Sequence, residues 1–100
     1  MTVLITCALG AQAHQLKKTM PIDTEIILGD YADVPEVMIK SKQIIQLPSP
    51  AGPSYQHQML ALCLDNRVDA VYPLDAKEFN ALAESEQLFA EYGISINRTV

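Results

Sequence analysis

The chain has 100 residues, of which 49% are hydrophobic and 19% charged, a composition that predicts one folded domain over residues 1–100 and argues against disorder. Its formal net charge is −5, and its seven Lys and Arg residues include no run longer than Lys17-Lys18. This charge pattern argues against a nucleic-acid partner, because binding a phosphate backbone needs clustered basic residues.

The first half of the chain alternates strand-like apolar runs with helical or loop segments. Its apolar, β-branched start is typical of a buried strand. This apolar run is too short to span a membrane, and it lacks the basic residues that begin an export signal. The expected elements are a strand at 2–7, a turn at 8–10 and a helix that Pro21 ends, a strand at 24–28, a loop with one helical turn at 31–42, and a strand at 43–47.

The second half begins with the loop PSPAGPS at 48–54, in which Pro and Gly act as turn residues. A helix follows over about 53–66, with either Gly52 or Ser54 as its cap. An apolar run at 68–72 then predicts a fourth strand, which Pro73 closes. Residues 97–100 carry no structural signal.

The stretch from Asp75 to Ile96 predicts a helix followed by a last strand. Asp75 and Glu78 have the spacing of a capping box, in which the Glu78 side chain reaches back to the cap. Glu86 interrupts the apolar stripe, so the helix is expected to bend or split there, and Gly93 is placed as its left-handed terminator. The apolar stripe comprises Phe79, Leu82, Ala83, Phe89 and Tyr92.

This order of elements predicts an α/β fold: a Rossmann-like three-layer sandwich with a five-stranded, mainly parallel sheet of order 3-2-1-4-5 and three helices. Ligands of such sheets bind beyond the carboxyl ends of the strands, here between the first and fourth strands. That edge contains residues 7–10, Asp30 and residues 72–77. The expected core is Val3, Ile5, Leu16, Ile26, Ile27, Leu60, Val71, Leu82 and Phe89.

Three chemical interpretations of these residues are weaker than structural ones. The turn CALGAQA has only Gly10 where a dinucleotide fingerprint needs three glycines, although Asp30 lies where a ribose-binding acid would; anion binding at the following helix N-terminus stays open. His14 and His57 have no metal-ligand spacing. Asp75 and Glu78 could act as acid and base, but capping explains both, and no complete catalytic set occurs.

The two cysteines, Cys7 and Cys63, lie in apolar strand and helix contexts without CxxC spacing. Reduced core thiols in a cytoplasmic protein are therefore favoured over a disulfide or a metal site.

Four segments taken together carry a family resemblance: TVLITCALG at the start, GD after the second strand, LPSP before the second helix, and VDAVYPLDAKEFNALAESEQLFAEYGISI at the end. They resemble the N-terminal pre-ATP-grasp domain of carbamoyl-phosphate-synthase-like ATP-grasp ligases. The resemblance covers nearly all 100 residues and rests on combined order and spacing. One departure is the first turn, where many relatives carry two or more glycines.

The resemblance implies a non-catalytic, substrate-side domain of a carboxylate–amine ligase, without catalytic or metal residues of its own. The nucleotide clamp and the metal carboxylates of such ligases lie in the ATP-grasp region that follows this domain. ATP and magnesium are therefore expected for a full-length parent and no cofactor for this chain, which alone should be inactive. The implied partner is a C-terminal ATP-grasp region of the same or a separate chain, with a small-molecule substrate possible and no membrane partner.

The switch-point geometry and this resemblance together predict one wall of a substrate pocket, made by Ala8, Leu9, Gly10, Asp30, Pro73, Asp75 and Lys77. The alternative is a free-standing Rossmann-like module that binds a small ligand or a partner. A reading frame that continues past Val100 into a Gly-rich nucleotide-binding segment would discriminate between the two.

Overall fold

The computed structural model describes residues 1–98, and its centre is one five-stranded parallel sheet with the order β3-β2-β1-β4-β5. Both the α/β class and this strand order are as predicted. The strands are β1 (Thr2–Ile5), β2 (Glu25–Asp30), β3 (Ile45–Gln46), β4 (Ala70–Tyr72) and β5 (Ser95–Ile96). In the central pair, Leu4 of β1 lies opposite Val71 of β4 in a parallel register, as the predicted strand order requires of the first and fourth strands.

The strand ends differ from the predicted ones for local reasons. β1 ends at Ile5 because Cys7 adopts a left-handed backbone conformation, with φ 56°. β2 continues through Gly29, which pairs with Ile45 of β3. A Cβ at Gly29 would lie 2.8 Å from Leu47 side-chain carbons, so glycine allows the Leu47 side chain to pack directly against β2.

Within residues 1–98, five helices surround the sheet, where three were predicted: α1 (Ala11–Thr19), α2 (Glu36–Lys40), α3 (Tyr55–Asp65), α4 (Ala76–Ala83) and α5 (Glu86–Glu91). Helix α2 is the single helical turn expected within 31–42. The predicted last helix divides into α4 and α5 immediately before Glu86, which confirms the expected split. Gly93, with φ 76°, follows α5 as the expected left-handed residue, and Ser54 rather than Gly52 precedes α3 as its cap.

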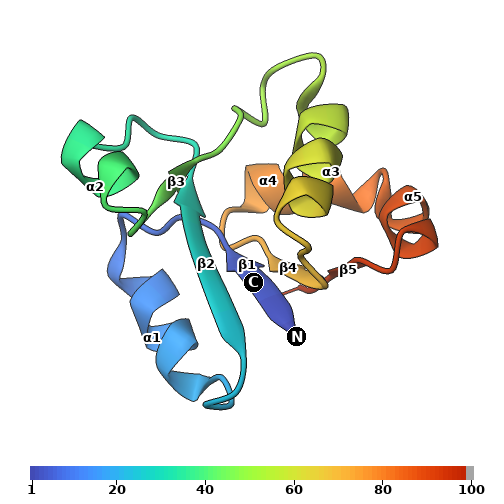
Figure 1. The fold of residues 1–100 in the computed structure, drawn as a ribbon. Coiled ribbons are helices and arrows are strands. Elements are labelled where there is room, and N and C mark those ends of the chain that lie inside the picture. Colours follow the sequence, from blue (N-terminus) through green and yellow to red (C-terminus); the bar gives the residue numbers. More distant parts are fainter. Residues whose placement is uncertain (99–100) are drawn as a thin grey trace.

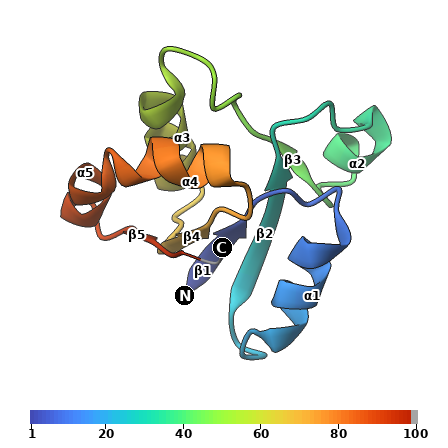
Figure 2. The same cartoon turned by 180° about the vertical axis from the view of Figure 1, so that it is seen from behind.

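Helices lie on both sides of the sheet, giving three layers (Figures 1 and 2). Helices α3, α4 and α5 contribute to one core cluster with Leu4 and Val71 of the sheet. The second cluster joins Val3 and Ile5 to Ala13 of α1, and Met38 of α2 packs against it. Successive residues of β1 therefore face opposite cores, as expected for a strand covered on both faces.

The structure confirms the centre of the predicted core, whereas the predicted residues at its margin are only partly buried. Val3, Ile5, Val71, Leu82 and Phe89 are buried. The other four predicted positions are only partly buried and pack against the edges of the two clusters: Leu16, Ile26, Ile27 and Leu60.

The residues that follow α5 differ in part from the prediction. Tyr92, placed on the apolar stripe by the sequence, is 55% exposed because α5 has ended before it. Asn97 donates its N–H to the Val71 carbonyl and so extends the β5 pairing by one residue. The remainder of the tail lies partly outside the described residues, at positions 99 and 100. No helix within residues 1–98 has the length and apolar character needed to cross a membrane.

Candidate ligand-binding edge of the sheet

Asp30 connects the end of β2 to the turn after β1. Its side chain is 6% exposed, and its two carboxylate oxygens accept hydrogen bonds from the N–H groups of Leu9 (3.0 Å) and Ala32 (2.9 Å). An acidic residue at this position therefore has a structural role, because the Asp30 carboxylate satisfies two backbone donors. A ribose-binding role for Asp30 gains no support from the arrangement.

The turn Ala8–Gly10 uses its backbone donors within the protein. The Ala8 N–H donates to the Gly29 carbonyl (3.1 Å), the Leu9 N–H to Asp30, and the Gly10 N–H to the Cys7 carbonyl (3.0 Å). Gly10 precedes α1 with an ordinary φ of −96°, and the left-handed residue of the turn is Cys7. These three amides are therefore already satisfied, and a ligand at this turn would meet its side chains and carbonyls.

Asp75 joins the carboxyl end of β4 to that of β2. One of its oxygens accepts from the Lys77 N–H (3.3 Å), which confirms Asp75 as the cap of α4, and the other accepts from the Tyr31 hydroxyl. This hydrogen bond to Asp75 is the main reason that the pKa of Tyr31 rises to about 12. Pro73, fully buried, directs the chain from β4 toward this cap.

Glu78 does not complete the predicted capping box, and this is the main correction to the sequence-based site. Its side chain is 0% exposed and turns inward on α4 beside Leu82. One carboxylate oxygen accepts from the Cys7 thiol (3.4 Å) and the other from the Tyr55 hydroxyl (3.5 Å). The inward position follows from helix geometry, because Glu78 is one turn before the buried Leu82 on the same face.

Burial dominates the electrostatics of this group. It raises the pKa of Glu78 to about 7; hydrogen bonds from Thr6 and Cys7 act in the opposite direction. Burial, followed by the nearby Glu78 charge, raises the pKa of the Cys7 thiol to about 12. The Tyr55 hydroxyl is likewise made less acidic, so its pKa lies above its usual range. Neutral donors therefore contact the carboxyl group, and Glu78 forms no ion pair with any residue between 1 and 98.

A cavity of about 440 Å³ lies at the carboxyl edge, next to Tyr31, the residue that donates to Asp75. Lys77 and Asn80 of α4 line it together with Tyr31. The PSPAGPS loop at 48–54 contributes Ser49, Pro50 and Ala51 to its lining. The sequence predicted Lys77 here, but it did not identify Tyr31, Asn80 or the loop; the rigid Pro-rich composition of that loop was the available signal.

The predicted wall is therefore not one continuous surface. Lys77 lines the 440 Å³ cavity together with Tyr31, whose hydroxyl donates to Asp75. Ala8 and Leu9 line a different cavity, next to α1. Within residues 1–98, no three His, Cys, Asp or Glu side chains are grouped to hold a metal ion.

The family model for the PylC-like, N-terminal domain matches residues 3–97, almost the whole of this sheet and its helices. The chain belongs to this family. The match confirms the resemblance to the N-terminal pre-ATP-grasp domain of ATP-grasp ligases that the sequence carries. A search of curated proteins finds none that matches this PylC-like domain.

Proposed function

We propose that this PylC-like domain is the substrate-side, non-catalytic domain of a carbamoyl-phosphate-synthase-like ATP-grasp ligase, which joins a carboxylate to an amine. The family match over residues 3–97 carries this proposal. The partner is an ATP-grasp region, on the same or a separate chain, that faces the carboxyl edge of the sheet. A cytoplasmic location fits the two free thiols, Cys7 and Cys63.

The cavity beside Lys77 supports a substrate-side role. Lys77 supplies a cation on α4, and the Tyr31 hydroxyl is held in place by Asp75. An ammonium group at the wall of a cavity attracts a carboxylate, and a fixed neighbour limits how that carboxylate can turn. In the proposed ligase, Lys77 orients the substrate and the loop Ser49–Ala51 excludes water from that side.

The partners of the predicted site carboxylates and turn amides support the proposal that Mg-ATP binds elsewhere in the ligase. Asp30 and Asp75 are committed to backbone or tyrosine donors, and Glu78 is buried among neutral groups. Magnesium needs accessible carboxylates, and phosphates need positioned donors that the turn Ala8–Gly10 has already used. ATP and magnesium in the proposed ligase therefore belong to the ATP-grasp region, and this chain contributes no step through them.

The test uses this domain together with its ATP-grasp region, located by reading the coding sequence beyond Val100 or in neighbouring genes. ADP release is measured over a panel of amino acids and carboxylates. We expect Lys77→Gln to raise the KM of the accepted carboxylate or amine with little change in the KM of ATP. Lys18→Gln, a charge change on an exposed face of α1, is the matched control. An unchanged substrate KM in Lys77→Gln would contradict the proposed role of this cavity.

A further inference from the structure

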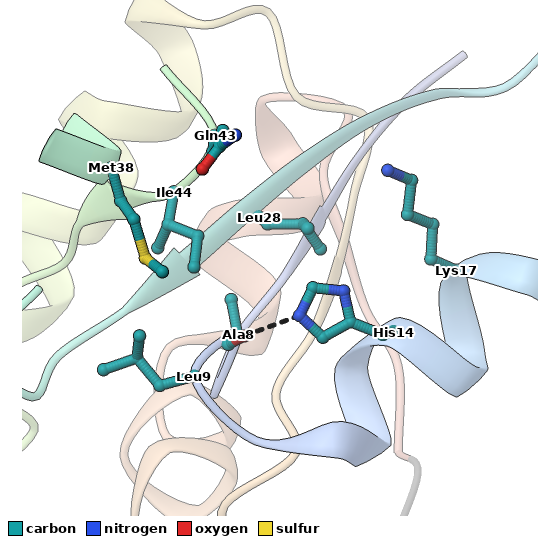
Figure 3. A pocket seen from close by; sticks show the side chains of 8 residues that line it. All are labelled: Ala8, Leu9, His14, Lys17, Leu28, Met38, Gln43 and Ile44. Carbon is teal, nitrogen blue, oxygen red and sulfur yellow. Dashed lines mark hydrogen bonds between the residues drawn. The ribbon is translucent and has the colours of Figure 1, made fainter. Parts of the chain in front are cut away.

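A second cavity, of about 420 Å³, lies on the side of the sheet covered by α1 and α2 (Figure 3). Its floor comes from the second core cluster, whereas Tyr31 of the Lys77 cavity packs against the first. The two cavities therefore lie on opposite faces of the sheet. The volume falls within the range of about 300–1,000 Å³ typical of small-molecule sites.

The floor and walls of this cavity are apolar. Leu28 of β2 and Ile44, just before β3, are buried and form the floor. Met38 of α2 and Leu9, which is 44% exposed, flank the opening. Figure 3 shows the Met38 and Leu9 side chains on one side of this floor and His14 on the other. Such a surface favours the burial of an aliphatic group over that of a fully polar ligand.

One end of the cavity is cationic. The His14 Nε2 atom lies 2.9 Å from the Ala8 carbonyl oxygen, and because a carbonyl only accepts hydrogen bonds, Nε2 carries a proton. The second ring nitrogen lies on the side of Lys17 (Figure 3). The Lys17 ammonium forms no ion pair within residues 1–98, where the recorded pair is Lys40–Glu36.

The charge of this end differs from that of the whole chain. None of the described residues that line the cavity is acidic, although the net charge of the chain is −5. Gln43 adds an amide, which can donate to an anion, at the rim. The cavity therefore combines an apolar floor with an unneutralised ammonium group and polar donors at one side.

We propose that this cavity binds a small aliphatic monocarboxylate. The aliphatic part lies on Leu28 and Ile44, and the carboxylate is held by the Lys17 ammonium. A ligand of the same length with a neutral or cationic head loses this charge-assisted contact. The site is independent of the proposed ligase role, because it lies on the other face of the sheet from Lys77.

The test is an NMR titration of the 15N-labelled 100-residue chain with hexanoate, using 1-hexanol and hexylamine as ligands of similar length. We expect saturable shifts centred on the amides of Leu9, Leu28 and Ile44. Lys17→Gln should weaken hexanoate binding about three- to tenfold. Lys18→Gln removes the same charge one residue away, outside the cavity lining, and should leave the dissociation constant unchanged.

Each alternative outcome overturns the proposal. Absence of saturable hexanoate binding, or shifts centred on Tyr31 and Lys77, would show that this cavity is not the site. Equal weakening by the Lys17→Gln and Lys18→Gln changes would show a diffuse charge effect. Hexanol binding as tight as hexanoate would show that the cationic end does not select a carboxylate. The amide spectrum itself reports whether each variant is folded.

Discussion

The Cys7 thiol donates a hydrogen bond to the buried Glu78 carboxyl group, with 3.4 Å between Sγ and Oε1. This contact links the turn after β1 to the first turn of α4, 71 residues later in the chain. Tyr55 of α3 donates to the other oxygen of Glu78. Three segments thus meet at one carboxyl group, which has no ion-pair partner in the described part of the chain. Burying its charge is therefore costly.

Glu78 should make the domain less stable as the pH rises from about 4.5 to about 7. Its pKa is raised from 4.5 to about 7 by burial, so the folded state holds a proton that the unfolded state has lost over this interval. Stability from this group is therefore complete below the unfolded pKa and is lost as the pH passes the folded pKa, by at most about 3 kcal/mol.

Urea unfolding at several pH values measures this effect. Glu78→Gln should reduce the difference in unfolding free energy between pH 4.5 and pH 8, because the amide does not titrate. Glu86→Gln, a change at an exposed position, should retain the wild-type pH dependence. Parallel curves for the wild type and Glu78→Gln would refute the raised pKa.

Cys7 should react slowly with iodoacetamide at pH 8. The thiolate is the nucleophile, and burial together with the Glu78 charge raises the pKa of Cys7 to about 12. Glu78→Gln removes the negative charge and should accelerate alkylation of Cys7. Mass spectrometry of the Cys7 peptide measures the alkylation rate. Cys63, whose pKa burial alone raises to about 12, is the internal reference. An unchanged Cys7 rate in Glu78→Gln would argue against this coupling.

Asp75→Ala should destabilise the domain by about 0.5–2 kcal/mol, the usual cost of losing a helix N-cap. The change also removes the acceptor of the Tyr31 hydroxyl. Tyr31→Phe removes only that second contact and should therefore cost less than Asp75→Ala. Chemical denaturation of the two variants compares them, and an Asp75→Ala protein as stable as the wild type would mean that the cap contributes nothing.

Leu82→Ala should cost about 2–5 kcal/mol, because Leu82 is 0% exposed within the first core cluster and its truncation leaves a cavity. Leu64→Ala is the control, since Leu64 is 44% exposed on α3 and should change stability by less than about 1 kcal/mol. Equal losses of unfolding free energy in the two variants would show that the face of α4 carrying Leu82 is not the one packed in the core.

The sheet could be predicted from the sequence because its signals are local. Continuous apolar runs such as residues 2–7, separated by helical segments, require parallel crossovers, and these restrict the strand order. Glu86 likewise marked the division between α4 and α5. The same local logic identified Asp75 as a cap, because capping depends on residues within one helical turn.

The centre of the site could not be predicted because it depends on distant partners. Glu78 has the spacing of a capping box, and only the tertiary positions of Cys7 and Tyr55 draw its side chain inward. The left-handed conformation of Cys7 also lacked a signal, since Gly or Asn usually occupies such positions. The second cavity requires the short helix α2, whose Met38 closes one side, and the sequence showed no clear helical period there.

Calorimetry of the 100-residue chain with Mg-ATP tests the central claim most directly. A substrate-side domain whose carboxylates and turn amides are committed internally should show no heat beyond dilution and no ATP hydrolysis. The same result is expected for Lys77→Gln and Asp75→Ala. Micromolar binding of Mg-ATP by the wild-type chain, or turnover that either substitution abolishes, would contradict the account and reveal a nucleotide site within this domain.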